Sequence, residues 1–126
     1  MTLSLYNVIW RLLRPILPLV IGWRQQKCKE KAGRPYDRYG QPSFEVPLSG
    51  VVWLHSVSIG ETIAAISLAK ALAQTQPEAK FLITTNTVGA AELVQREIAT
   101  GFPMFHAFQP LDHPLFVDRF LAKVNP

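Results

Sequence analysis

Residues 53–61 read Trp53-Leu54-His55-Ser56-Val57-Ser58-Ile59-Gly60-Glu61 and join an apolar run to a helical pattern that begins at Glu61. A buried parallel strand that turns directly into a helix has this pattern, and ligand-facing groups then gather at the strand's carboxyl end. Gly60 lets a ligand or another backbone come close, and the Glu61 carboxylate lies near the positive end of the helix dipole. The stretch therefore predicts an α/β fold with its functional site around Glu61.

The residues on both sides of this stretch continue the alternation. Strands are predicted at 51–55, 81–85 and 104–108, and helices at 61–73, 88–99 and 114–124. Asn86 and Thr87 are suited to cap the second helix and Asp112 the third. Strands that alternate with helices predict a parallel, doubly wound Rossmann-like sheet. We expect this domain to occupy residues 49–126, after a basic juxtamembrane segment and linker at 24–48 that contains Pro42 and Pro47.

The composition limits the class of protein. With 126 residues the chain has room for one small domain, and 48% hydrophobic and 17% charged residues are typical of a globular protein. Cys28 is the only cysteine, so no intramolecular disulfide forms and a reducing compartment is expected. The three histidines show no metal-ligand spacing, so we predict no metal site and no cofactor.

The net charge of +4 is unevenly distributed. Residues 1–38 carry eight basic and two acidic side chains, a net charge of +6, and the remainder carries five basic and seven acidic ones, a net charge of −2. A basic segment beside an apolar one favours a membrane surface over nucleic acid as a partner. If the apolar segment spans a bilayer, the basic run at 24–38 places the rest of the chain in the cytoplasm.

The apolar segment itself, residues 3–23, has about the ~20 residues that span a bilayer. Arg11 and Arg14 near its middle oppose a simple span, and two prolines are expected to kink the helix. A spacing of three and four residues puts the polar side chains on one helical face: Ser4, Asn7, Arg11 and Arg14. Three placements remain open: a span, a helix in the membrane interface with Trp10 and Trp23 as anchors, or a helix packed on the domain.

The motifs that bind phosphates are missing, because neither a G-x-G-x-x-G nor a G-x-x-x-x-G-K-[ST] pattern occurs. Polar residues instead follow all three predicted strands: His55, Ser56, Ser58 and Glu61 after the first, Thr84, Thr85, Asn86 and Thr87 after the second, Gln109 and Asp112 after the third. Glu61 is the one residue of the first group suited to act as a general base, although it equally suits a helix cap supported by Ser58. His55 is explained either as a hydrogen-bonded strand-end residue or as a catalyst.

Residues 54–66, LHSVSIGETIAAI, resemble the H-x-V-S-V-G-E signature of the bacterial 3-deoxy-D-manno-octulosonic acid (Kdo) transferases. Further segments follow in the family's order: the N-terminal apolar helix, the basic motif that includes Arg34, Asp37, Arg38 and Gly40, the ITTNT run at 83–87, and PLD at 110–112 followed by FL at 120–121. The resemblance thus covers nearly the whole chain. Thr87-Val88-Gly89 stands where many members read T-P-T-G-S, and Tyr36-Asp37 stands where glycine and glutamate are more common.

The resemblance implies a GT-B fold, in which two Rossmann-like domains enclose a cleft. It also implies metal-independent transfer of Kdo from CMP-Kdo to a lipid A precursor at the cytoplasmic face of the bacterial inner membrane. It assigns the role of catalytic base to Glu61. We expect the substrate-binding residues to be Ser56, Ser58, Gly60, Thr85, Thr87 and Arg38.

The family's E-x-x-W-P segment and nucleotide-binding domain do not occur within these 126 residues. We therefore expect the chain to be the acceptor-binding, N-terminal part of a transferase, inactive alone. Two other classes remain open: a different membrane-associated GT-B glycosyltransferase, and a non-enzymatic membrane-tethered α/β module.

Overall fold

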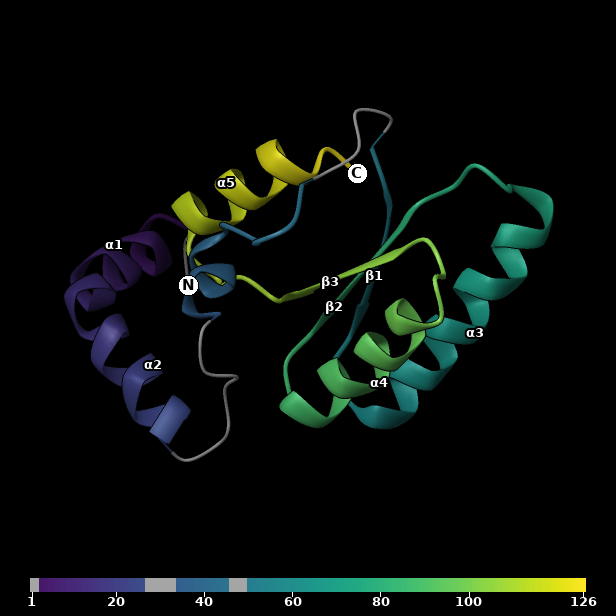
Figure 1. The fold of residues 1–126 in the computed structure, drawn as a ribbon. Helices are drawn as coiled ribbons and strands as arrows, with labels where there is room; N and C mark the ends of the chain where they lie inside the picture. The colour runs from purple at the N-terminus through teal and green to yellow at the C-terminus, as the bar shows by residue number, and fades with distance from the viewer. Residues whose placement is uncertain (1–2, 27–33, 46–49) are drawn as a thin grey trace.

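A three-stranded parallel sheet forms the centre of the computed structural model, which describes residues 3–26, 34–45 and 50–126. The strands β1 (Val52–Ser56), β2 (Phe81–Thr85) and β3 (Met104–Phe108) lie in the order β1-β2-β3. Helices α3 (Ile59–Thr75) and α4 (Val88–Ala99) cover one face, and α5 (Pro114–Val124) covers the other (Figure 1). The predicted Rossmann-like α/β layering is confirmed.

The core lies on both faces of β2, all of whose residues are buried. Phe81 and Ile83 pack toward α3 and α4, against Ile66 and Val94 among others. Side chains alternate between the faces of a strand, so Leu82 points the other way and packs with residues of α5 and β3. Burial on both faces explains why a central parallel strand reads as a continuous apolar run instead of an alternating one.

The helix starts differ from the predictions in two places. Strand β1 is shifted by one residue, and α3 begins at Ile59, two residues earlier than expected, because Ser58 and Glu61 form a capping box. Thr87 caps α4, as predicted. The prediction that Asp112 caps α5 is wrong, because the cap is His113, whose Nδ1 accepts a hydrogen bond from the Leu115 N–H at 3.1 Å.

The N-terminal segment forms a broken helix at the end of the molecule opposite α3 (Figure 1). Helix α1 (Leu3–Leu13) continues through a 3-10 turn, η1 (Arg14–Ile16), into α2 (Leu17–Gln26). The break falls at Pro15, which has no backbone N–H to continue the helical ladder. The Tyr6 hydroxyl donates hydrogen bonds to the Asp112 carbonyl, at 3.0 Å, and to its carboxylate. Helix α1 therefore turns a polar face toward the start of α5.

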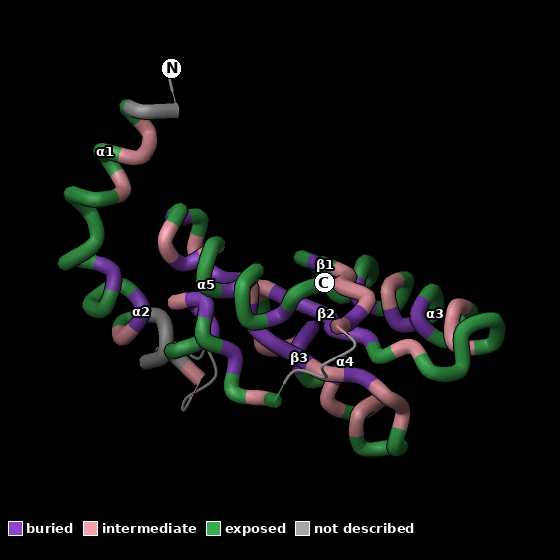
Figure 2. The backbone as a smooth tube through the Cα atoms, turned by 90° about the horizontal axis from the view of Figure 1, so that it is seen from above, coloured by how far each residue is buried: buried purple, intermediate pink, exposed green. Residues whose placement is uncertain are grey.

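The outer face of this broken helix is apolar and exposed (Figure 2). The 19-residue stretch Leu5–Trp23 is long and apolar enough to cross a membrane, and 11% of it is buried in the fold. The large exposed side chains of the face are Leu5, Val8, Ile9, Leu12, Leu13, Ile16, Leu19, Val20 and Trp23. A patch of this kind marks a surface that another apolar phase or partner covers.

Residues 34–45 pack against the sheet domain. The 3-10 helix η2 (Pro35–Tyr39) places Asp37 beside β3, where the Phe108 N–H donates to its Oδ2 at 3.0 Å. Further along, Lys123 of α5 donates a hydrogen bond to the Pro42 carbonyl at 2.5 Å. The domain boundary predicted near Ser49, and Cys28 with its neighbouring lysines, lie outside the described residues.

Candidate functional site

The turn from β1 into α3 holds the Glu61 carboxylate in a fixed position. Its Oε2 accepts hydrogen bonds from the Val57 N–H at 2.7 Å and the Ser58 N–H at 3.4 Å, while Ser58 Oγ accepts from the Glu61 N–H at 3.2 Å. Glu61 is nevertheless exposed, and its Oε1 makes no hydrogen bond within the described part of the chain. One oxygen thus caps the helix while the other is available to a ligand.

Gly60 lies next to this carboxylate and is also exposed. A Cβ atom built on Gly60 would meet nothing within 4 Å, so the fold of this chain does not itself require glycine here. The open space in front of the residue is suited to close approach by a ligand or by another part of a larger protein.

Two of the predicted substrate-binding residues are fully buried instead. Ser56 shares a hydrogen bond of 2.8 Å with the Thr62 hydroxyl, which in turn donates to the Ser58 carbonyl at 2.8 Å. Thr85 lies inside the sheet, with its Oγ1 2.9 Å from His106 Nε2. Both hydroxyls stabilise the ends of their strands through hydrogen bonds inside the fold. Thr87, in contrast, is exposed at the start of α4.

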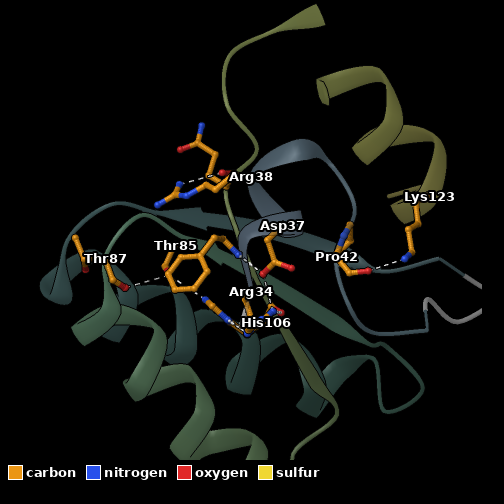
Figure 3. Close-up of polar contacts among 10 residues, drawn as sticks. Arg34, Asp37, Arg38, Pro42, Thr85, Thr87, His106 and Lys123 are labelled. Atoms are coloured by element: carbon orange, nitrogen blue, oxygen red, sulfur yellow. Dashed lines mark hydrogen bonds and ion pairs between the residues drawn. The ribbon is translucent and has the colours of Figure 1, made fainter. Parts of the chain in front are cut away.

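The basic motif forms a buried cluster behind β3 (Figure 3). Arg34 donates to His106 Nδ1 at 2.8 Å and to the His106 carbonyl at 2.6 Å, and it pairs with Asp37 at 2.8 Å. Arginine only donates, so His106 Nδ1 is an acceptor, and Nε2 carries the proton that is given to Thr85. Asp37 is 1% exposed, and burial raises the pKa of its carboxyl, an effect that the Phe108 N–H and the Arg34 charge partly oppose.

Arg38 joins the ends of β2 and β3. Its guanidinium donates to the Asn86 side-chain oxygen at 3.2 Å, to the Asn86 carbonyl at 3.0 Å and to the Gln109 carbonyl at 3.0 Å. It also lies over the Phe108 ring, 5.2 Å from its centroid, and the residue is 6% exposed. The planar fork of arginine fits such a set of acceptors better than any other side chain. Arg38 therefore fixes two loops, a role that the substrate-binding prediction did not include.

A cavity of about 470 Å³ lies where these loops face the N-terminal helix. Its polar wall includes Arg38, Asn86 and Gln109 at the strand ends, and its apolar wall comes from α1 and α2. The residues that line it are Trp10, Leu17, Val20, Ile21, Arg38, Asn86, Gln109, Pro110, Leu111 and Asp112. A wall of each kind suits a ligand that has both a polar and an apolar part.

The predicted site residues thus form two groups. Ser58, Gly60 and Glu61 stand at the end of β1, near the start of α4, where a Cβ on Gly89 would lie 3.6 Å from Ile59. Arg38 belongs to the second group, at the ends of β2 and β3. Within the described residues, no cluster of three or more histidine, cysteine, aspartate or glutamate side chains is placed to hold a metal ion.

Sequence reasoning missed Thr62, the pairing of Arg34 with His106, and the cap formed by His113. Thr62 had a local signal, because a hydroxyl in the first turn of a helix can bond back to the preceding turn. The contact between Arg34 and His106 had none, since 72 positions separate the two residues. Only the folded arrangement brings η2 to β3.

A parallel sheet with its polar groups at the carboxyl edge, and a carboxylate at the start of the first helix, is compatible with the N-terminal Rossmann-like half of a GT-B glycosyltransferase. Comparison with known proteins identifies the family. Residues 25–126 match the family model described as 3-deoxy-D-manno-octulosonic-acid transferase (kdotransferase), and the chain belongs to this family.

Individual relatives agree with this assignment. The chain is 35% identical over 122 residues to a probable mitochondrial 3-deoxy-D-manno-octulosonic acid transferase of Arabidopsis thaliana, a match that covers 97% of the chain and 27% of the relative. It is 29% identical over 124 residues to the transferase of Haemophilus influenzae, covering 96% of the chain and 28% of the relative. The transferase of Bordetella pertussis is 33% identical over 124 residues, which cover 90% of the chain and 28% of the relative.

The chain therefore spans little more than a quarter of the length of these relatives. No solved structure matches it.

Proposed function

We propose that the chain is the acceptor-binding part of an enzyme that transfers Kdo from CMP-Kdo to a lipid A precursor. Membership of the Kdo transferase family supports the transferred sugar, and the resemblance described above supplies the donor and the acceptor. The observation that carries the proposal is the exposed Glu61 carboxylate, which is held by backbone N–H groups at the carboxyl end of β1.

In this reaction Glu61 acts as a general base. Its Oε1 takes the proton of the acceptor hydroxyl while that oxygen attacks the anomeric carbon of Kdo, and the bond to the phosphate of CMP breaks. The two N–H groups on Oε2 fix the carboxylate, and the helix dipole stabilises its negative charge. A well-placed general base contributes about 10²- to 10⁴-fold to the rate.

The acceptor approaches the exposed edge that contains Ser58, Gly60 and Thr87. In this proposal Ser56 and Thr85 support that edge from inside the fold, and Arg38 holds the neighbouring loops in place. The 126 residues alone are expected to show no Kdo transfer, since the proposed donor site belongs to the second domain of a GT-B enzyme.

The partner of residues 1–23 in this proposal is the inner membrane of a bacterium, with the sheet domain at residues 49–126 on the cytoplasmic side. The exposed apolar face of α1 and α2 supports an interfacial position, because the polar side of α1 is already turned toward α5. Such a position keeps the acceptor edge close to lipid substrates.

The test is the variant Glu61→Gln, measured in a full-length protein that contains this chain. Glutamine also serves at the third position of a capping box, so α3 keeps its cap while the base is lost. We expect Kdo transfer to fall by about 10²-fold or more while the unfolding free energy stays within about 0.5 kcal/mol of the wild type. Glu92→Gln, an exposed change of the same kind on α4, is the control and should leave transfer unchanged.

The capping box also favours a second explanation, in which Glu61 only stabilises the helix. Wild-type transfer by the Glu61→Gln protein would establish that explanation and remove Glu61 from the mechanism. Assays of the same full-length protein with CMP-Kdo and with nucleotide-diphosphate sugars separate a Kdo transferase from another GT-B enzyme. Activity with neither donor would favour a non-enzymatic module.

A further inference from the structure

A second cavity, of about 510 Å³, lies between the N-terminal helix and α5, away from the acceptor edge. Arg11 of α1 and Arg14 of η1 form one wall, together with the Asn7 amide. The start of α5 forms the other, through His113, Pro114, Leu115 and Asp118. These residues have no role in the proposed transfer reaction.

The two guanidinium groups have no ion-pair partner among the residues that the structure describes, although Asp118 lines the same cavity. Both arginines are exposed to solvent at this cavity, and Asp118 is the single carboxylate among its lining residues. Their charges also act on His113, whose pKa is lowered, first by burial and then by Arg14 and Arg11. The lining therefore combines two guanidinium groups with one carboxylate and has a net positive charge.

His113 adds a hydrogen-bond donor that has no acceptor. The ring is 5% exposed, lies between Trp10 and Phe116, and uses Nδ1 to cap α5. With Nδ1 an acceptor, the neutral ring carries its proton on Nε2. This buried Nε2 has no hydrogen-bond partner within the described part of the chain, an arrangement that is unfavourable unless a ligand supplies an acceptor.

We propose that this cavity is a phosphate-binding site, with Arg11 and Arg14 as its charged ligands and His113 as a neutral donor in its wall. Guanidinium groups bind phosphate oxygens with paired, charge-assisted hydrogen bonds. The backbone N–H groups of Leu115, Phe116 and Val117 already bond to His113, so the end of α5 contributes only its dipole. Asp118 limits the affinity, because its carboxylate repels the same anion.

Two sources of phosphate fit this chemistry: a free anion and the head group of a membrane lipid. The position of Arg11 and Arg14 favours the lipid, because the same helix exposes Leu12, Leu13 and Ile16 toward its outer face. An interfacial helix places such arginines at the depth of lipid phosphates. This site does not depend on Kdo transfer, and its test measures binding alone.

The experiment compares binding of the full chain to inorganic phosphate, to phosphatidylcholine vesicles, and to phosphatidylcholine vesicles that contain phosphatidic acid. The variants are Arg11→Gln and Arg14→Gln, with Arg96→Gln as a charge-matched control on the exposed surface of α4. We expect each cavity variant to weaken phosphate or phosphatidic acid binding at least about tenfold, and the control to change it little. Asp118→Asn should strengthen the same binding.

A fourth change in the cavity, His113→Asn, keeps a good helix cap and removes the Nε2 donor. Nuclear magnetic resonance of the His113 ring gives a second readout, since phosphate in the cavity should shift its Nε2 signal in the wild type. Saturable binding of either source that the cavity variants abolish supports the site, and the better-bound source identifies the ligand. Failure to bind either source, or an equal loss in Arg96→Gln, overturns the proposal.

Discussion

At the scale of single residues, Arg38 shows that a predicted substrate-binding residue also holds the loops around it in place. The sequence placed it among the substrate-binding residues. In the fold its guanidinium donates hydrogen bonds to the Asn86 side chain and to the carbonyls of Asn86 and Gln109. The guanidinium also lies over the Phe108 ring. These bonds hold the loops that follow β2 and β3, so Arg38 determines the position of the polar wall of the 470 Å³ cavity.

The variant Arg38→Lys tests this positioning role. Lysine keeps the charge but lacks the planar fork, so the carbonyls of Asn86 and Gln109 lose hydrogen-bond donors. We therefore expect the unfolding free energy to fall by about 1–3 kcal/mol. Arg119→Lys, at an exposed position of α5, should change stability by less than about 0.5 kcal/mol. Chemical denaturation measures both. A fully stable Arg38→Lys protein that loses acceptor binding would instead make Arg38 a direct ligand.

At the scale of elements, the sequence was sufficient where the signals are local. The predicted bounds of β2, α4, β3 and α5 agree with the structure. Three of these elements carry a local boundary signal, since Thr87 caps α4, Pro103 precedes β3 and Pro114 begins α5. The start of α3 was placed two residues late, although Ser58 and Glu61 carry the spacing of a capping box. The cap of α5 was assigned to Asp112, whereas His113 forms it and Asp112 accepts a hydrogen bond from Tyr6, 106 positions away.

The same distinction applies to the candidate site. Glu61 and Thr87 could be placed from the strand-to-helix turns in which they occur. The burial of Ser56 and Thr85 could not, because both depend on which way a strand-end hydroxyl points in the folded sheet. The sequence also left open whether the N-terminal helix spans a membrane, lies in its interface or packs on the domain, and the hydrogen bond from Tyr6 to Asp112 could not be predicted from it.

That helix exposes its apolar face, and a membrane is the proposed partner of this face. Leu12 and Leu19 are 71% and 73% exposed, so they contribute little to the folded core. The double variant Leu12→Gln/Leu19→Gln should lose about 3 kcal/mol of membrane binding, roughly a hundredfold in vesicle partitioning, with unchanged thermal stability. Leu68→Gln, at an exposed leucine of α3, is the control. Equal partitioning of wild type and double variant in vesicle flotation would contradict an interfacial helix.

At the scale of the whole molecule, Gly40 and Gly60 differ in whether the fold itself needs a glycine at that position. Gly40 ends η2 with φ of +75°, and a Cβ there would lie 2.0 Å from the Phe116 carbonyl oxygen of α5. The basic motif can therefore pack closely against α5 only because Gly40 has no side chain. Gly60 stands in the first turn of α3 with open space before it, so nothing within the described residues excludes a side chain.

The paired variants Gly40→Ala and Gly60→Ala should consequently behave in opposite ways. Gly40→Ala should reduce the unfolding free energy by more than about 2 kcal/mol, because alanine is strained at positive φ and its Cβ clashes with α5. Gly60→Ala should raise it by up to about 1 kcal/mol, since alanine favours the helix. In a full-length protein that contains this chain, however, the same Gly60→Ala change should weaken acceptor binding or transfer, because it fills the approach to Glu61. Undiminished transfer by a stabilised Gly60→Ala protein would show that no substrate comes close to this turn.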